Sequence, residues 1–212
     1  MKGIFITFEG NEGCGKSTHV RLLGQFLKKV GFKVYVTHEP GDNSMGKKIR
    51  EMLLNPKNKN VSSCAELFLY LADRAQHVAE KILPLLEKGY IVLCDRFADA
   101  TAAYQGYGRD IDLALVNAMN DMAIQKRKPD LTILMDIDVK EGLRRAKKVG
   151  PYKGDRMERQ KMRFHEKVYS GYKAIAKKDP KRFQIVKVDD TIENVQDRIR
   201  EMVCLKIFSA RS

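Results

Sequence analysis

Cysteine, long apolar runs and low-complexity segments are all scarce in this chain of 212 residues. The four cysteines, at positions 14, 64, 94 and 204, form no CxxC pair and no cluster with histidine. This spacing argues against a zinc site and against a disulfide framework, so we expect reduced thiols. No apolar run approaches the roughly eighteen residues that span a bilayer. The first residues lack the pattern of a signal peptide, so we expect a cytoplasmic protein with no membrane partner.

Acidic residues are outnumbered by basic ones, 27 to 40, which gives a formal net charge of +13. Such an excess suits an anionic partner, either a nucleotide or a nucleic acid. The basic residues are scattered, with only short clusters at 126–128 and 144–148 and no basic tail. We therefore do not expect nucleic-acid binding. No linker interrupts the chain, so residues 1–212 are predicted to form a single domain.

Apolar runs of strand length alternate with longer segments of helical spacing. The predicted strands are 4–8, 34–37, 91–94, 131–135 and 185–188. The predicted helices follow residue 18 and cover 64–86, 111–124, 139–148, 157–176 and 192–208. This alternation predicts an α/β fold with a parallel sheet covered by helices on both faces. In such sheets ligands bind beyond the carboxyl ends of the strands.

The segment GNEGCGKST, residues 10–18, joins the first predicted strand to the first predicted helix. Glycines let the backbone turn tightly and direct successive N–H groups at phosphate oxygens, with a helix N-terminus beneath them. Lys16 adds a positive charge, and Ser17 adds a hydroxyl suited to Mg²⁺. The loop therefore predicts a nucleoside triphosphate site. Its residues are Gly10, Asn11, Glu12, Gly13, Cys14, Gly15, Lys16, Ser17 and Thr18.

A second group of polar residues points to a phosphorylated acceptor. Asp95 ends the third predicted strand, where an acid can hold Mg²⁺ opposite Ser17, and Arg96 follows it. Arg50 and Arg74 lie in two other segments that approach the strand ends, and arginine can clamp a phosphate through two hydrogen bonds. No NKxD base-reading motif follows a strand, which disfavours a GTPase.

Residues 147–159, KKVGPYKGDRMER, are rich in Lys and Arg and are broken by two glycines and a proline. We interpret this segment as a mobile cationic lid between two helices. A solvated hinge is the alternative.

Six motifs together resemble the thymidylate kinase family, whose members phosphorylate dTMP with ATP. They are FEGNEGCGKST, HEPG, LFLYLADRAQHV, DRF with TAAYQGYGR, PDLTILMDID and GDRMERQ. The match covers nearly the whole chain, and LADRAQHV with AYQGYGR is its most specific part. The resemblance implies the P-loop NTPase fold of nucleoside monophosphate kinases, with a five-stranded parallel sheet and a short lid. It also implies MgATP and dTMP as ligands, and a homodimer.

The same resemblance assigns roles on the acceptor side. Tyr70 is expected to stack on thymine and Arg74 to hydrogen-bond the base edge, although a core aromatic is the alternative for Tyr70. Thr101 and Gln105 would add contacts around the base. Tyr104 would occupy the space of a ribose 2′-hydroxyl and so select the deoxy sugar.

Phosphate and donor roles follow in the same way. Glu12 would face the 3′-hydroxyl of the acceptor, and Arg50 with Arg96 would hold its phosphate. Ser17 and Asp95 would bind Mg²⁺. Arg145 would stack on adenine, and Arg156 would reach the transferring phosphoryl group from the lid. We expect Lys16, Asp95, Arg96 and Arg156 to be the catalytic residues.

Some positions depart from the family pattern. His38 and Ala100 stand where Arg and Ser are common, and Lys147 replaces a frequent lid arginine. The lid cation that contacts the transferring group is thus left open among Lys147, Lys153 and Arg156. Two rival functions are also open: a kinase for another small acceptor such as dUMP, and a nucleic-acid-dependent ATPase.

Overall fold

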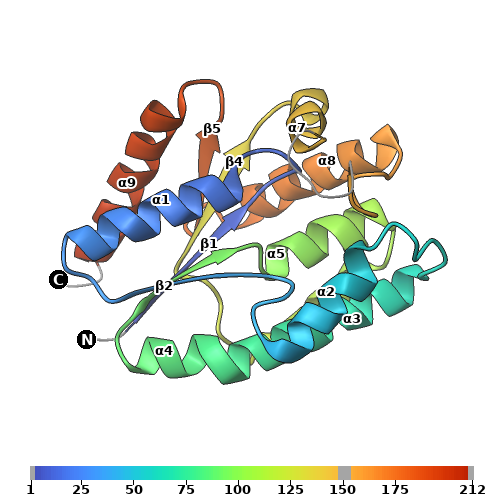
Figure 1. Cartoon of the computed structure of the whole chain (residues 1–212), viewed down its shortest axis with the longest axis horizontal. Helices are drawn as coiled ribbons and strands as arrows, with labels where there is room; N and C mark the ends of the chain where they lie inside the picture. The colour runs from blue at the N-terminus through green and yellow to red at the C-terminus, as the bar shows by residue number, and fades with distance from the viewer. Residues whose placement is uncertain (1–2, 148–153, 210–212) are drawn as a thin grey trace.

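The computed structural model describes residues 3–147 and 154–209 and contains one five-stranded sheet (Figure 1). Its strands are β1 (Ile4–Glu9), β2 (Val34–His38), β3 (Ile91–Asp95), β4 (Leu131–Asp136) and β5 (Phe183–Lys187). Their order is β2-β3-β1-β4-β5, and all four neighbouring pairs are parallel. The predicted fold is confirmed, with β5 beginning two residues earlier than expected.

Helices lie on both faces of the sheet. In chain order they are α1 (Lys16–Lys29), α2 (Ser44–Leu54), α3 (Ser63–His77), η1 (Val78–Ile82), α4 (Leu83–Glu87), α5 (Ala98–Thr101), η2 (Ala102–Gly108), α6 (Leu113–Ala123), α7 (Val139–Ala146), α8 (Met162–Lys178) and α9 (Ile192–Ser209). The elements η1 and η2 are π-helical turns. Such turns are frequently found at functional sites, and η2 lies at the candidate site described below.

The alternation of side chains along the strands explains why both faces are covered. In β1, Ile4, Ile6 and Phe8 pack with α1 and α9 in one core cluster. Phe5 points to the other face and packs with η1 and α4 in a second cluster. Since side chains in a strand alternate between faces, a strand that is apolar throughout must be covered on both.

Three segments differ from the sequence prediction. The predicted helix 157–176 begins only at Met162, because the Asp155 carboxylate accepts hydrogen bonds from the backbone N–H groups of Met157 and Glu158 and holds a turn there. The helix α2 was not predicted, although Asn43 caps it by accepting from Gly46 N at 2.7 Å. The helical turns of α5 and η2 were not predicted either.

The described part of the chain contains no helix that combines the length and the apolar character needed to cross a membrane.

Candidate active site

The sheet order brings the predicted loop and the predicted acid together. Strands β1 and β3 are neighbours, and Phe8 is paired in register with Asp95. The loop after β1 and the residues after β3 therefore emerge side by side at the carboxyl edge of the sheet.

A cavity of about 610 Å³ opens at this edge. It is lined by fourteen of the predicted site residues, namely Glu12, Gly13, Gly15, Lys16, Ser17, Thr18, Arg50, Tyr70, Asp95, Arg96, Thr101, Tyr104, Gln105 and Arg145. Gly10, Asn11, Cys14, Arg74 and Arg156 do not line it. Residues from five separate parts of the chain thus converge on one space.

The loop from Gly10 to Thr18 has the curled backbone that its glycines predict. Gly10, Gly13 and Gly15 have φ values of +137°, +67° and +88°, a region that side chains with a Cβ rarely adopt. The buried Lys16 ammonium donates to the carbonyls of Gly10 and Asn11 at 3.1 and 2.8 Å. The loop carbonyls thus hold the Lys16 ammonium group at the N-terminus of α1, a position suited to binding an anion.

Sequence reasoning missed Gly142, which sets how closely α7 approaches this loop. A Cβ at Gly142 would lie 2.4 Å from the carbonyl oxygen of Glu12, and a Cβ at Gly13 would lie 1.9 Å from that of Gly142. Backbone therefore packs directly on backbone here. An isolated glycine within a helical pattern was the available signal.

At the mouth of the loop the Ser17 hydroxyl donates a hydrogen bond to Asp95 Oδ2. Both residues line the cavity, so a hydroxyl oxygen and a carboxylate stand side by side beside the phosphate loop. Hard oxygen ligands of this kind suit Mg²⁺, and the residues present fit that ion.

Arg96, Glu12 and Tyr104 form a charged cluster in the cavity. The Arg96 guanidinium lies 2.8 Å from Glu12 Oε1, and the Tyr104 hydroxyl donates to the same oxygen at 2.7 Å. Burial alone would raise the pKa of Glu12, but Arg96 and Lys16 outweigh it and lower that pKa to about 2. Arg96 also has a φ of +71°, a strained value for a residue with a side chain.

Behind this cluster lies Glu9, which the sequence did not single out. It is fully buried, accepts from the Tyr172 hydroxyl and from Phe97 N at 2.8 Å each, and sits beneath Arg96. Burial, followed by repulsion from Asp99, raises the pKa of Glu9 to about 8. Glu9 is therefore mostly uncharged near neutral pH, and the Tyr172 hydroxyl, which also accepts from Arg96, links the two residues.

The residues predicted for the base split into two layers. Tyr70, Thr101 and Gln105 line the cavity, whereas Arg74 lies behind them and is almost completely buried. Arg74 donates to Glu39, Thr101, Asn120 and the Phe97 carbonyl at 2.8 to 2.9 Å. Four of its five N–H donors are thus used within the protein.

The predicted lid residues are only partly within the described chain. Arg156 is buried: its Nε donates to the Leu53 carbonyl at 2.6 Å and its guanidinium pairs with Glu66, also at 2.6 Å. Arg145 lines the cavity and pairs with Glu141 at 2.7 Å. Lys147 is exposed, and Lys153 lies outside the described residues.

The two departures from the family pattern both face the cavity. His38 lines the cavity, and the partial loss of water around its ring, together with the charge of Arg50, lowers its pKa. Ala100 is a buried lining residue on α5.

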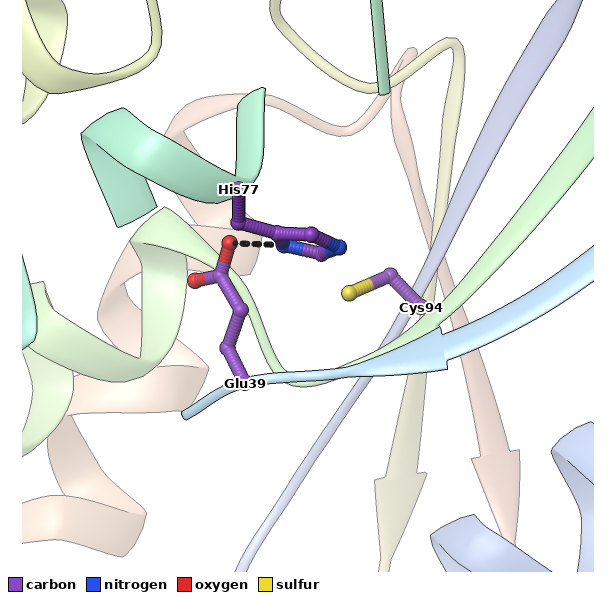
Figure 2. Close-up of side chains that lie close together, drawn as sticks. All are labelled: Glu39, His77 and Cys94. Carbon is purple, nitrogen blue, oxygen red and sulfur yellow. Dashed lines mark hydrogen bonds and ion pairs between the residues drawn. The ribbon is translucent and has the colours of Figure 1, made fainter. Parts of the chain in front are cut away.

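Within the described residues one further cluster resembles a metal site: Glu39, His77 and Cys94 (Figure 2). The His77 ring is hydrogen-bonded on both sides, to Glu39 Oε1 and to Thr37 Oγ1 at 2.8 Å each. The second Glu39 oxygen accepts from Arg74. Burial raises the pKa of the Cys94 thiol well above its usual range, which keeps it protonated. The cluster therefore joins β2, α3 and β3 and is not suited to bind an ion.

Comparisons with known proteins agree on one family. A family model described as thymidylate kinase matches residues 8–199. The chain is 46% identical to the thymidylate kinase of Halothermothrix orenii, covering 96% of this chain and 97% of that protein. It is 49% identical to that of Geobacter sp. strain M21, covering 87% and 84%. Its fold matches the crystal structure of thymidylate kinase from Ehrlichia chaffeensis with a TM-score of 0.79, 33% identity and coverage of 96% and 99%.

Proposed function

The chain belongs to the thymidylate kinase family, and from that premise we propose that the cavity at the carboxyl edge of the sheet holds ATP and dTMP together for direct phosphoryl transfer. The protein phosphorylates dTMP to dTDP with ATP as the donor, a step in dTTP synthesis. The observation that supports a shared cavity is that phosphate loop, acceptor arginines and base-facing residues line the same space.

On the donor side, the loop amides and Lys16 bind the phosphates of ATP, and Arg145 stacks on the adenine. Ser17 and Asp95 would hold Mg²⁺ with the nucleotide. The ion neutralises charge on the phosphates when it is bound. Arg145, near the end of α7, lines the cavity, and the exposed Lys147 lies two residues further along the chain.

On the acceptor side, Tyr70, Thr101 and Gln105 bind the thymine, and Arg50 with Arg96 binds the phosphate. Glu12 accepts a hydrogen bond from the 3′-hydroxyl of the sugar. Tyr104 packs where a ribose 2′-hydroxyl would be placed, and its own hydroxyl is anchored on Glu12. Arg74 supports this site from behind through Thr101.

In the reaction an oxygen of the dTMP phosphate forms a bond to the γ-phosphorus of ATP. The bond from that phosphorus to the β,γ-bridging oxygen breaks, and ADP leaves with the electron pair. The acceptor phosphate is already ionised, so no strong base is required. Arg96 and Lys16 stabilise the charge on the transferring group by position alone.

The lid, residues 147–159, belongs to the same domain and supplies Arg156 to the transferring phosphoryl group. To reach it, Arg156 exchanges the Leu53 carbonyl and Glu66 for phosphate oxygens once ATP is bound. Replacing Arg156 by Ala and Lys147 by Ala in separate variants tests this assignment. A much larger loss of kcat in the Arg156 variant supports it, and the reverse order would contradict it.

We also propose a homodimer formed through the helices α2, α3 and α6. Helix α3 packs against both others, and large apolar side chains remain exposed on them: Met52, Phe68, Leu115 and Met122, between 52% and 82% exposed. Exposed apolar groups gathered in this way mark protein interfaces. Sedimentation of Phe68→Asp should show a monomer, whereas the control Leu205→Asp on α9 should stay dimeric. A dimeric Phe68→Asp would contradict the interface.

We place the enzyme in the cytoplasm, where its four free thiols would stay reduced. The acceptor site itself is tested by steady-state ADP release with dTMP, dUMP, dCMP and dGMP at fixed MgATP. Clear preference for dTMP supports the proposed base site. Equal turnover of dCMP or dGMP would contradict it.

A further inference from the structure

Two buried charges stand directly behind the base-facing wall of the cavity, Glu66 behind Gln105 and Arg74 behind Thr101. We propose that these charges fix the hydrogen-bonding polarity of Gln105 and Thr101, and that this polarity makes the pocket select thymine over cytosine. The inference rests on the proposed placement of the dTMP base against these two residues.

The orientation of the Gln105 amide follows from its partner. Gln105 Nε2 donates to Glu66 Oε1 at 2.9 Å, and a carboxylate can only accept. The amide nitrogen is therefore turned away from the base, toward α3. The amide oxygen accepts no hydrogen bond from the described residues, although Gln105 is 1% exposed and lines the cavity. Gln105 thus offers the base an acceptor.

Glu66 remains charged although it is completely buried. Arg109 binds it through Nε and Nη2, both at 3.0 Å, and Arg156 pairs with Oε2 at 2.6 Å. Burial would raise the pKa of Glu66, but the hydrogen bonds and charges of Arg109, Gln105 and Arg156 outweigh it and lower that pKa. While Arg109 and Arg156 pair with it, Glu66 is thus a charged acceptor for Gln105.

Arg74 fixes the hydrogen-bonding direction of Thr101, which becomes a donor toward the cavity, whereas Gln105 is an acceptor. Its Nη1 donates to Thr101 Oγ1 at 2.8 Å, and a guanidinium cannot accept. The hydroxyl proton of Thr101 must therefore point elsewhere, and Thr101 lines the cavity. One helical turn apart, Thr101 presents a donor and Gln105 presents an acceptor.

This pair matches one pyrimidine edge and not the other. Thymine carries a donor at N3–H and an acceptor at O4, whereas cytosine carries an acceptor at N3 and a donor at N4. Cytosine would place an acceptor opposite the Gln105 oxygen and a donor opposite the Thr101 hydroxyl, so neither hydrogen bond could form. Uracil has the same N3–H and O4 groups as thymine. The donor of Thr101 and the acceptor of Gln105 therefore discriminate against cytosine but do not separate dTMP from dUMP.

The variant Glu66→Gln should change the group that Gln105 presents to the base from a hydrogen-bond acceptor to a donor. Two guanidinium nitrogens meet at Oε2, those of Arg109 and Arg156, whereas Oε1 has one, Arg109 Nε, besides Gln105, so the oxygen of the new amide takes the Oε2 position. Its nitrogen then faces Gln105 Nε2, and two donors cannot pair. Gln105 turns over and presents its NH₂ group to the base.

The measurement is the dissociation constant of dTMP and of dCMP by calorimetry without ATP, so that Arg156 stays on Glu66. In Glu66→Gln the preference for dTMP over dCMP should fall by about tenfold or more, the effect of one mismatched buried hydrogen bond. The exchange variant Glu66→Gln/Gln105→Glu should restore the preference, because a carboxylate oxygen again faces N3–H. The control Glu80→Gln makes the same chemical change on the surface and should alter nothing.

An unchanged preference in Glu66→Gln would overturn the role of Glu66. If that variant does not fold, Gln105→Met removes only the acceptor: weaker dTMP binding with unchanged dCMP binding supports the inference, and unchanged dTMP binding overturns it. Wild-type protein without any preference for dTMP over dCMP would instead overturn the proposed base site itself.

Discussion

Replacing Gly142 by Ala should disable the phosphate loop although Gly142 does not line the cavity. The new methyl carbon would lie 2.4 Å from the Glu12 carbonyl oxygen, about 1 Å inside ordinary contact, which begins at 3.4 Å. The obstacle is backbone, so no side chain can rotate away. Helix α7 or the loop must move by about that distance, and Ile137 Cγ2, 3.3 Å from the methyl, restricts the helix.

The added methyl group of Gly142→Ala should lower both the free energy of unfolding and the rate of the reaction. Overpacking a tight site costs about 1–3 kcal/mol, partly offset by the better helix propensity of Ala, about 1 kcal/mol. A displacement of about 1 Å in positioned groups can cost about a hundredfold in rate. We therefore expect Gly142→Ala to fold, with a melting temperature lowered by a few degrees, and to lose about a hundredfold in kcat/KM for ATP.

Gly24→Ala is the matched control, because it also adds a methyl within a helix. Its methyl would meet Val36 Cγ2 at 2.5 Å, the end of a β2 side chain that lines the cavity outside the phosphate loop and can rotate away. It should change stability but leave kcat/KM near the wild-type value. A Gly142→Ala enzyme with wild-type kcat/KM, or equal losses in both variants, would refute the reasoning.

Three other predictions concern the cluster around Arg96 and the base site. Arg96→Ala should lower kcat by orders of magnitude in ADP-release assays, because it also leaves the half-buried Glu12 without its ion-pair partner. Tyr70→Ala should mainly raise the KM for dTMP, and a kcat loss with unchanged KM would contradict that role. Glu9 has a folded-state pKa raised to about 8 from about 4.5, so its burial costs the wild type stability as pH rises through that window. Glu9→Gln should therefore gain on the order of a few kcal/mol relative to wild type between pH 5 and pH 8.5 in urea unfolding, and parallel curves would argue against a buried neutral Glu9.

Much of the fold was predictable because local sequence patterns indicate where strands, helices and tight loops occur. Apolar runs mark buried strands, and the glycines of residues 10–15 mark a loop with positive φ values. The pairing of β1 with β3 was implied only by the shared role of Ser17 and Asp95. The helix α2 was missed although Asn43 and the spacing of Ile49 and Leu53 were there to be read.

Networks of distant side chains could not be predicted in the same way. Glu66 meets Arg109 and Arg156 across 43 and 90 positions of sequence, and no spacing rule relates them. Arg74 illustrates the same limit, because its motif predicts a role at the base site but not that Arg74 lies behind the residues that line the cavity. The sequence predicts which residues gather at the strand ends, and tertiary packing decides which of them face the ligand.

The central claim is that donor and acceptor share one cavity, and a bisubstrate ligand tests it most directly. A compound that joins adenosine and thymidine through a chain of phosphates would span the loop and the base site together. Inhibition that is competitive against both ATP and dTMP is the predicted result. Competition against only one of them would contradict a shared cavity.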